Sequence, residues 1–331
     1  MTVGRGATIF GCDGPELGEW ERAFFRDADP FGFILFGRNV ETPDQLRRLT
    51  AQLREAVGRD APVLVDQEGG RVQRLRSPHW HEHLPALDMV ARAVNPLRAM
   101  ELRSTLIAAE LRAVGIDANC APVADIAGPD THPFLRNRCY GTDAAGVAAL
   151  ARVAADAHLA QGVLPVIKHM PGHGRATADS HKHLPRVTAA ADELAQNDFA
   201  PFKALADVPM AMTAHIVYEA LDDRPATCSI VMIDIIRNQI GFDGLLMTDD
   251  IEMEALSGSV AERAAASILS GCDVVLHCNG PHEARIAVAT SAGTMTPDAL
   301  RRARVALDAR RAPAPIDVAL LHSELAALLN A

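Results

Sequence analysis

Short apolar runs recur along the chain and determine how it is organised. Several of them are continuous rather than alternating, as in Phe33-Ile34-Leu35-Phe36, which is the pattern of strands that are buried on both faces. The runs cover residues 7–12, 31–36, 62–66, 119–125, 163–168, 208–215, 244–249 and 273–277. Their recurrence predicts a sheet of eight strands.

Segments with helical periodicity and capping signals separate most of these runs. The clearest covers residues 43–57, with Thr42 as its predicted N-cap and Gly58 as its predicted end. Pro43 occupies the first helical position, and Gln45 is placed to complete a capping box. We predict further helices at residues 97–114, 143–161, 190–206, 229–240, 256–270 and 297–310.

Strand–helix alternation repeated eight times indicates an α/β fold with a parallel sheet. A closed (β/α)8 barrel of the TIM type fits this count, and an open doubly wound sheet is the alternative. No glycine-rich dinucleotide fingerprint follows the first strand, which weakens the open sheet. We therefore predict one barrel domain over residues 1–331, with a helical tail at about 312–331. Long βα-loops are expected after strands 3, 4 and 5, at residues 67–96, 126–142 and 169–189.

Composition narrows the classes of partner and compartment. Apolar residues make up 49% of the 331 residues and charged residues 22%, as in an ordinary globular protein. The net charge of −10 argues against nucleic-acid binding, and no apolar run reaches the roughly 20 residues that a membrane helix needs. The N-terminus lacks the apolar region of a secretory signal, and the six cysteines form no CxxC pair. We expect a cytoplasmic protein with no nucleic-acid or membrane partner.

Charged or imidazole side chains end six of the apolar runs. In a barrel, the carboxyl ends of the strands form the rim on which active sites lie. Each residue alone could instead cap a helix or bind neighbouring backbone, but six strand ends together favour a catalytic rim. The residues are Asp66, Asp125, Lys168-His169, His215, Asp249-Asp250 and His277.

The densest polar segment covers residues 168–185, where four histidines and one aspartate lie within 15 residues. A metal site is one interpretation, because imidazole and carboxylate are good zinc ligands. Acid–base catalysis is the other. Asp179 and His181 are separated by one residue, so an extended segment would place them on the same face. A carboxylate beside an imidazole fixes its tautomer and favours its protonated form, which suits a proton shuttle.

Two other segments supply carboxylates. The run at 244–249 delivers Asp249 and Asp250 to its end, and only one of these neighbours is expected to face the barrel mouth. A rigid carboxylate there could be a nucleophile, a metal ligand or a cation partner. In residues 65–74, Asp66 is followed by two glycines and two arginines, which suits a ligand with several hydroxyls. An internal Asp–Arg ion pair is the alternative use of these charges.

These three segments together resemble glycoside hydrolase family 3, specifically its bacterial β-N-acetylglucosaminidase branch. They read VDQEGGRV at 65–72, KHMPGHG with a following DSH and LP at 168–185, and GF with a following DD at 241–250. The similarity extends from about residue 7 to 280, and two shorter segments, Asn137–Tyr140 and Pro225–Thr227, resemble further motifs of the family. Met170, Thr248 and residues 251–253 depart from the family pattern.

The resemblance implies a (β/α)8 barrel and assigns roles to individual residues. Asp249 matches the nucleophile, His181 the general acid/base and Asp179 the carboxylate that pairs with it. Five residues match those that bind the terminal N-acetylglucosamine: Asp66, Arg74, Arg138, Lys168 and His169. No metal and no cofactor are implied.

The implied activity is that of a retaining exo-β-N-acetylglucosaminidase acting on a small-molecule substrate. This substrate would be a muropeptide, GlcNAc linked β-1,4 to 1,6-anhydro-N-acetylmuramic acid, with or without peptide, as in peptidoglycan recycling. A monomer or weak homodimer is expected.

Three alternatives stay open from the residues alone. The first is a metal-dependent barrel hydrolase built on the loop histidines and Asp249-Asp250. The second is a family 3 enzyme of other specificity, either a β-glucosidase or a GlcNAc phosphorylase. The third is a sugar-binding protein without activity, which the complete set of Asp249, His181 and Asp179 disfavours. The alternating histidines His79, His81 and His83 are expected to lie on an exposed loop rather than to bind a metal.

Overall fold

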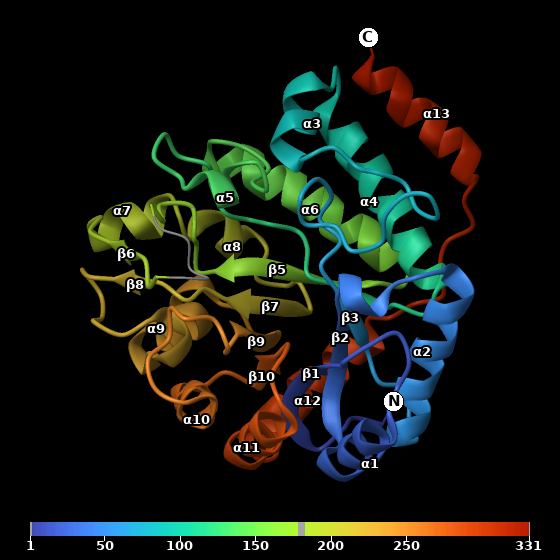
Figure 1. Ribbon diagram of the computed structural model, residues 1–331. Helices are drawn as coiled ribbons and strands as arrows, with labels where there is room; N and C mark the ends of the chain where they lie inside the picture. Colours follow the sequence, from blue (N-terminus) through green and yellow to red (C-terminus); the bar gives the residue numbers. More distant parts are fainter. Residues whose placement is uncertain (1, 178–182, 331) are drawn as a thin grey trace.

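The computed structural model describes residues 2–177 and 183–330, which form a closed barrel with helices around it (Figure 1). Within these residues the barrel has eight parallel strands, and each overlaps a predicted run, so the predicted barrel is confirmed and the open sheet was wrong. The barrel strands are β1 (Gly6–Gly11), β2 (Pro30–Leu35), β3 (Val63–Val65), β4 (Ala118–Asn119), β5 (Leu164–Met170), β7 (Met210–Thr213), β9 (Leu245–Asp250) and β10 (Val274–His277). Their order around the barrel is β1-β10-β9-β7-β5-β4-β3-β2.

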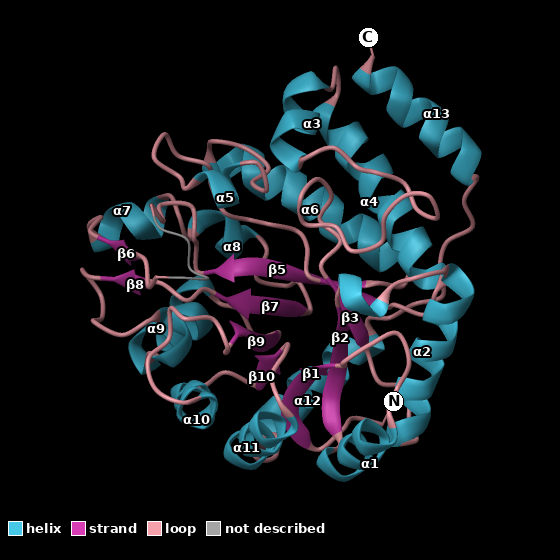
Figure 2. Ribbon diagram, viewed as in Figure 1, coloured by secondary structure: helices cyan, strands magenta, loops and turns pink. Residues whose placement is uncertain are grey.

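Helices cover the outside of the barrel, and the strands converge at its centre (Figure 2). The α-helices are α1 (Glu19–Ala28), α2 (Pro43–Val57), α3 (Ala86–Arg92), α4 (Pro96–Ala113), α5 (Pro133–Arg136), α6 (Ala144–Ala160), α7 (Ala191–Gln196), α8 (Ala200–Ala204), α9 (Ile230–Asp234), α10 (Val260–Ser270), α11 (His282–Ala292), α12 (Pro297–Asp308) and α13 (Val318–Leu329). Shorter 3-10 turns are η1 (Gly37–Asn39) and η2 (Ala226–Cys228), and η3 (Ile235–Ile240) is a π-helix.

Helix α2 has the predicted boundaries. The Thr42 hydroxyl accepts the backbone N–H of Gln45 at 3.3 Å, and Gly58 ends the helix at φ +62°, a conformation that glycine adopts without steric cost. The predicted capping box was wrong, because the Gln45 side chain accepts the N–H of Glu41 rather than that of Thr42. Gln45 therefore fixes the chain one residue before the cap.

Two predicted helices are interrupted in the structure. The segment predicted at 190–206 divides into α7 and α8 because Pro201 has no N–H and its ring clashes with the preceding turn of a continuous helix. The segment predicted at 229–240 begins as α9 and continues as the π-helix η3, which Gly241 ends at φ +83°. The outer helices α1 and α11 were not predicted.

The predicted long loops after the third, fourth and fifth barrel strands are confirmed. The first of them leads to α3, the second contains α5, and the third leads to β6 (Arg186–Val187). Strand β6 pairs with β8 (Val217–Tyr218) in a small separate parallel sheet. Because all three loops leave the carboxyl ends of their strands, they surround the same mouth of the barrel.

The predicted helical tail is present as α13, which packs on the outer helix α4 (Figure 1). Arg98 on α4 donates two hydrogen bonds to Glu324, at 2.7 and 2.9 Å, and Leu325 is buried between the helices. The Val94 N–H also donates to the carbonyl of Leu328 at 3.1 Å. These contacts tie the tail to the outer helix α4 and to the segment that precedes it.

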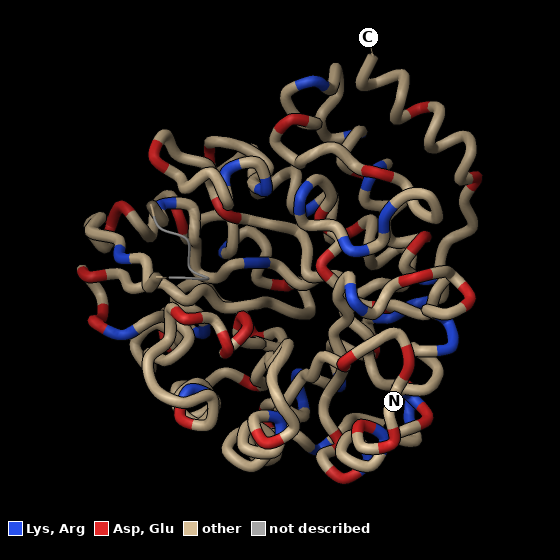
Figure 3. The backbone as a smooth tube through the Cα atoms, in the orientation of Figure 1, with Lys and Arg blue, Asp and Glu red and all other residues tan. Residues whose placement is uncertain are grey.

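Positively and negatively charged positions are interspersed along the backbone (Figure 3). In this view the described residues form no large tract of one sign. Among the described residues, no helix is both long and apolar enough to cross a membrane.

A buried histidine predicts an acid-sensitive stability. His158 on α6 contacts the carbonyl of Ala154 at 2.7 Å through Nδ1 and the amide of Asn119 at 2.9 Å through Nε2. Burial lowers the pKa of His158 to about 4. The unfolded chain then binds more protons between pH 6.5 and 4, so the free energy of unfolding is expected to fall by up to about 3 kcal/mol across that range.

This expectation is tested by thermal unfolding of the protein and of His158→Gln between pH 7.5 and 4.5. The variant should lose part of the acid-induced fall in Tm, whereas a variant of the exposed His79, His79→Gln, should follow the parent curve. Parallel curves for His158→Gln and the parent would contradict the assignment.

Candidate active site

A cavity of about 140 Å³, lined by both charged and apolar side chains, lies at the barrel mouth. Six predicted site residues line it, and they are Asp66, Arg74, Arg138, Lys168, His169 and Asp249. Their backbone positions are far apart in the sequence, and the closed barrel brings them together. Asp66 follows β3, Lys168 and His169 lie in β5, and Asp249 lies in β9.

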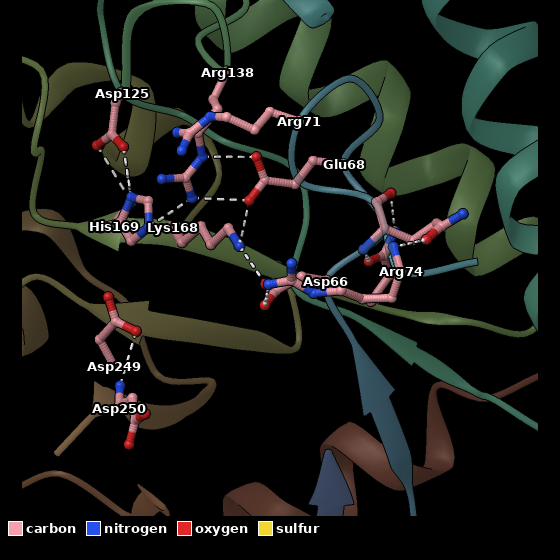
Figure 4. A network of polar contacts seen from close by, with 12 residues as sticks. Asp66, Glu68, Arg71, Arg74, Asp125, Arg138, Lys168, His169, Asp249 and Asp250 are labelled. Carbon is pink, nitrogen blue, oxygen red and sulfur yellow. Dashed lines mark hydrogen bonds and ion pairs between the residues drawn. The ribbon is translucent and has the colours of Figure 1, made fainter. Parts of the chain in front are cut away.

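Lys168 is the centre of a buried ion-pair network on one side of the cavity (Figure 4). Its Nζ lies 2.8 Å from Asp66 Oδ1 and 2.6 Å from Glu68 Oε1. Glu68 also accepts two hydrogen bonds from Arg138, both at 2.9 Å, and Arg74 donates to Asp66 at 3.1 Å. The Asp–Arg ion pair considered from the sequence therefore exists, as one part of a larger network.

The network keeps its acids ionised despite burial. Burial alone would raise the pKa of Asp66 and of Glu68, but the neighbouring Lys168 and Arg138 charges outweigh it and hold both pKa values below the ordinary range. The side chain of Lys168 is only 2% exposed, and the two carboxylates raise its pKa despite its burial. This side of the cavity thus presents fixed charges and hydrogen-bonding groups.

The imidazole of His169 lies between the carboxylate of Asp125 and the guanidinium of Arg138. Its Nδ1 lies 2.7 Å from Asp125 Oδ2, and its Nε2 lies 3.3 Å from Arg138 Nη2. A guanidinium only donates, so Nε2 accepts and the proton resides on Nδ1, which donates to Asp125. Asp125 thus fixes both the ring plane and the tautomer of His169. Burial would raise the pKa of Asp125, but His169 and His173 hold it below its usual value.

Asp125 also fixes the start of the loop that follows β5. Its Oδ1 accepts the backbone N–H of His173 at 2.6 Å. One residue later, Gly174 lies so close to the neighbouring loop that a Cβ there would be 2.0 Å from the carbonyl oxygen of Ile126. Glycine is therefore required at this position, and the loop is held against the segment that follows β4.

Asp249 lies across the cavity from the ion-pair network (Figure 4). Its Oδ1 accepts the backbone N–H of Asp250 at 2.8 Å. Burial would raise the pKa of Asp249, but His215 and His169 hold it below its usual value. An ionised carboxylate that lines the cavity and has few bonds to the protein is available to attack an electrophile.

The neighbouring Asp250 has a different environment. The sequence predicts that only one of the two acids faces the mouth, but both line the cavity because the strand ends and turns at this point. Asp250 Oδ1 accepts the backbone N–H groups of Glu252 at 3.2 Å and of Cys278 at 3.3 Å. Its carboxylate is therefore occupied in closing the turn, which leaves Asp249 as the available acid.

Two aromatic side chains form part of the cavity wall. Phe134 and Phe36 both line the cavity, and each carries an arginine over its ring. The guanidinium of Arg71 lies 3.6 Å from the centroid of Phe134, and that of Arg74 lies 5.6 Å from the centroid of Phe36. Apolar faces beside charged groups are typical of sites that bind sugar rings and polar substituents together.

The predicted acid/base His181 and its partner Asp179 lie outside the described residues. Of the same segment, Lys168, His169 and His173 are placed at the cavity, and the exposed His183 begins the next described stretch. The His173 side chain is 6% exposed, and burial lowers its pKa to about 4. His173 is therefore neutral at pH 7 and is not a proton donor there.

The segment that carries His79, His81 and His83 was predicted to be an exposed loop, and this prediction was partly wrong. His79 and His81 are exposed, but His83 is buried because its backbone bonds to Gln73 and to Gly70 hold the loop inward. The His81 ring lies 4.8 Å from the ring of His83 and 4.8 Å from that of His322. In the part of the chain that the structure describes, no group of three His, Cys, Asp or Glu side chains is arranged to hold a metal ion.

Sequence reasoning assigned no individual role to three residues that position the site. Glu68 lies within the quoted VDQEGGRV segment, and Asp125 and His215 each end an apolar run. Position at the end of a run singled out Asp125 and His215, and the motif contained Glu68, but neither signal could show which group each residue binds.

Comparisons with known proteins agree with this geometry. A family model described as the glycosyl hydrolase family 3 N terminal domain matches residues 21–307. A β-hexosaminidase of Bordetella avium is 36% identical over 318 residues, which cover 93% of this chain and 90% of that protein.

Two solved structures show the same likeness. NagZ from Neisseria gonorrhoeae, in complex with N-trifluoroacetyl-D-glucosamine, superposes with a TM-score of 0.87 at 29% identity over 99% of this chain and 98% of that one. A family 3 β-N-acetylglucosaminidase from Paenibacillus also gives 0.87, at 27% identity, and this chain spans 66% of its length. As its three motifs predict, the chain belongs to glycosyl hydrolase family 3.

Proposed function

We propose that the protein is a retaining exo-β-N-acetylglucosaminidase that removes a terminal non-reducing GlcNAc. The observation that carries this proposal is the cavity in which a free, ionised Asp249 faces the ion-pair network of Asp66, Lys168 and Arg138. The likeness to β-hexosaminidases, and to a structure that holds an N-acylated glucosamine, supports the same sugar here.

The ion-pair network is suited to hold the sugar. Asp66 has lone pairs that accept from sugar hydroxyls, and Lys168 and Arg138 donate to sugar oxygens. Because these charges neutralise one another, they are oriented before the substrate arrives, and binding does not require their reorganisation. His169 adds a ring whose orientation Asp125 fixes.

The chemical step uses Asp249 as nucleophile. Its carboxylate attacks the anomeric carbon, and the bond from that carbon to the leaving oxygen breaks. His181, paired with Asp179, gives a proton to the leaving oxygen and later takes one from the attacking water. The water then displaces Asp249 from the covalent glycosyl-enzyme, so two inversions leave the β configuration retained.

A His–Asp pair in place of the usual carboxylic acid suits this proton transfer. Histidine titrates closer to neutral pH than any other side chain in its ordinary state, so it can donate and accept a proton in turn. Asp179 and His181 hold these roles through their match to the family motif, as the acid/base pair on the loop after β5.

The substrate on the leaving-group side is proposed to be 1,6-anhydro-N-acetylmuramic acid, with or without a peptide. Arg71, whose guanidinium lies 3.6 Å from the centroid of Phe134 in the cavity wall, carries a positive charge that suits a carboxylate on that side. A cytoplasmic protein that acts as a monomer or weak homodimer, without metal or cofactor, agrees with a role in peptidoglycan recycling.

Parallel assays of p-nitrophenyl β-GlcNAc and β-glucoside test this proposal. Release is expected from the GlcNAc substrate alone, with the same rate in EDTA and in phosphate, and NMR should show β-GlcNAc as the first product. Release of GlcNAc 1-phosphate would identify a phosphorylase, and loss of activity in EDTA would identify a metal hydrolase. Activity on the glucoside alone would contradict the sugar assignment.

A further inference from the structure

A buried chain of hydroxyl and imidazole groups lies behind the end of β9. It consists of Thr213 at the end of β7, His215 two residues later and Thr227 in η2. The side chains of all three are buried, with no exposed surface. Thr227 belongs to the Pro225–Thr227 motif and His215 ends an apolar run, and neither takes part in the proposed chemistry.

The hydrogen bonds in this chain have defined directions. His215 Nε2 lies 3.0 Å from the carbonyl oxygen of Asp250, which can only accept, so Nε2 carries a proton. His215 Nδ1 lies 2.7 Å from the Thr227 hydroxyl, whose oxygen is 2.8 Å from that of Thr213. Burial lowers the pKa of His215, which keeps the ring neutral and makes Nδ1 an acceptor.

When the His215 ring is neutral, the Thr227 hydroxyl donates its single hydrogen bond to Nδ1 of that ring. The Thr227 oxygen then accepts from Thr213, although the carbonyl of Ala214 at 3.1 Å competes for the same Thr227 proton. The two threonines thus determine which nitrogen of His215 faces Asp250. Replacement of either hydroxyl by a methyl group would leave Nδ1 or Thr227 without its partner.

The backbone that His215 binds is the one that carries Asp249. The Asp250 N–H donates to Asp249 Oδ1 at 2.8 Å, and the Asp250 carbonyl is held by His215. The Asp250 carboxylate is fixed in turn by the N–H groups of Glu252 and Cys278. Asp250 is therefore held through its carbonyl and its side chain, and it positions the Asp249 carboxylate through its N–H.

We propose that His215, oriented by Thr227 and Thr213, is a positioning residue that sets the attack geometry of Asp249. It is not among the residues that line the cavity, so it acts through Asp250 rather than on the sugar. This inference rests on the proposed function, in which Asp249 is the nucleophile. It gives the Pro225–Thr227 motif a physical role.

The test compares four variants, Thr227→Val, Thr227→Ser, His215→Gln and His215→Phe. Steady-state rates are measured on p-nitrophenyl β-GlcNAc, and sugar binding is measured as the inhibition constant of free GlcNAc. His215→Phe keeps a ring but loses both hydrogen bonds, so kcat should fall about 10²-fold, as for a displacement of a reacting group by about 1 Å. The GlcNAc inhibition constant should stay within about twofold, because the sugar network is untouched.

Two variants that keep the hydrogen bonds, His215→Gln and Thr227→Ser, show whether the hydrogen bonds or only the packing of these side chains matters. A glutamine at 215 can donate to the Asp250 carbonyl and accept from Thr227. The kcat of His215→Gln should therefore be at least about tenfold higher than that of His215→Phe. Thr227→Val should lower kcat about tenfold, and Thr227→Ser, which keeps the hydroxyl, should restore it. If His215→Phe does not fold, the Thr227 pair alone decides the question.

Thr50→Val is the matched control for loss of a buried hydroxyl. Thr50 is 2% exposed, and its hydroxyl contacts the carbonyls of Arg47 and Val114, both at 3.0 Å, on α2 and the end of α4. It should lower Tm as Thr227→Val does, with kcat unchanged. This comparison distinguishes a positioning role from a general loss of stability.

Three outcomes would overturn the inference. They are a kcat of Thr227→Val within twofold of the parent, equal rates for Thr227→Val and Thr227→Ser, and a rise in the GlcNAc inhibition constant that matches the fall in kcat. Failure of the proposed function has a different signature, because Asp249→Ala would then stay active whatever the Thr227 variants do.

Discussion

Replacement of Asp249 by alanine is expected to lower kcat by about 10⁴-fold or more, with the fold unchanged. Asp249 is the acid whose carboxylate lines the cavity with few bonds to the protein, and under the proposed mechanism no glycosyl-enzyme can form without it. Because the pKa of Asp249 lies below its usual value, its charge is favoured in the folded protein, so the free energy of unfolding should fall slightly at pH 7. Rates on p-nitrophenyl β-GlcNAc and a thermal unfolding curve measure both effects.

Two neighbouring acids serve as comparisons for this variant. Asp250→Asn keeps an oxygen that accepts from Glu252 and Cys278, so its kcat should fall by no more than about tenfold. Asp243, at the opposite end of the same strand, pairs with Arg301 and Arg302 on the surface, and Asp243→Asn should leave kcat unchanged. If Asp250→Asn were as inactive as Asp249→Ala, the two roles would have to be exchanged.

The barrel could be predicted from the sequence because its signal is redundant. Apolar runs recur eight times, and several are continuous, as in Phe33–Phe36, which is the pattern expected of a parallel strand buried on both faces. The interruption at Pro201 was missed because the segment around it keeps a helical apolar pattern, although proline prevents one continuous helix. Periodicity thus indicates which face is buried, whereas backbone chemistry decides where a helix is interrupted.

The site could be predicted only as a set of residue types. The family motifs brought Asp66, Lys168 and Asp249 forward, and the structure places all three at one cavity. Lys168 forms ion pairs with both Asp66 and Glu68. These pairs depend on distances across the barrel, which the positions of the three residues in the sequence do not reveal. For the same reason Asp125 could be recognised at a strand end, but its bond to His169 could not.

The barrel explains why the positioning groups lie behind the cavity rather than in it. Each strand end delivers one or two side chains to the mouth, and the next residues turn away into loops. Glu68, Asp125 and His215 occupy such places, two residues beyond a strand or within the connecting segment. They bind Arg138, His169 and the Asp250 carbonyl, respectively, so each one orients a residue that lines the cavity.

Among the variants considered, Glu68→Gln is expected to lower both the free energy of unfolding and the activity of the protein substantially. The change leaves Lys168 and Arg138 with one buried carboxylate fewer, and the new amide group turns a donor toward the Arg138 fork. The free energy of unfolding should fall by about 3 kcal/mol. The displaced Lys168 and Arg138 should lower kcat/KM about 10²-fold.

An exposed ion pair of the same loop gives the matched control. Glu82 pairs with Arg76 at 2.8 Å, but their side chains are 46% and 43% exposed. Glu82→Gln should therefore cost no more than about 1 kcal/mol and leave kcat/KM unchanged. Equal losses of stability in the two variants would show that burial of the Glu68 network contributes nothing beyond an ordinary surface pair.

The loss of unfolding free energy in Glu68→Gln should depend on pH if its origin is electrostatic. Arg138 and Lys168 hold the pKa of Glu68 below its ordinary 4.5, although burial opposes this. A carboxyl with a depressed pKa contributes stability that is complete above its unfolded value and is lost as the pH falls through its folded value. The gap in unfolding free energy between the parent and Glu68→Gln should thus be constant above about pH 5.5 and shrink below pH 4.5 in denaturant titrations. A gap that persists unchanged at pH 3 would instead assign the effect to packing.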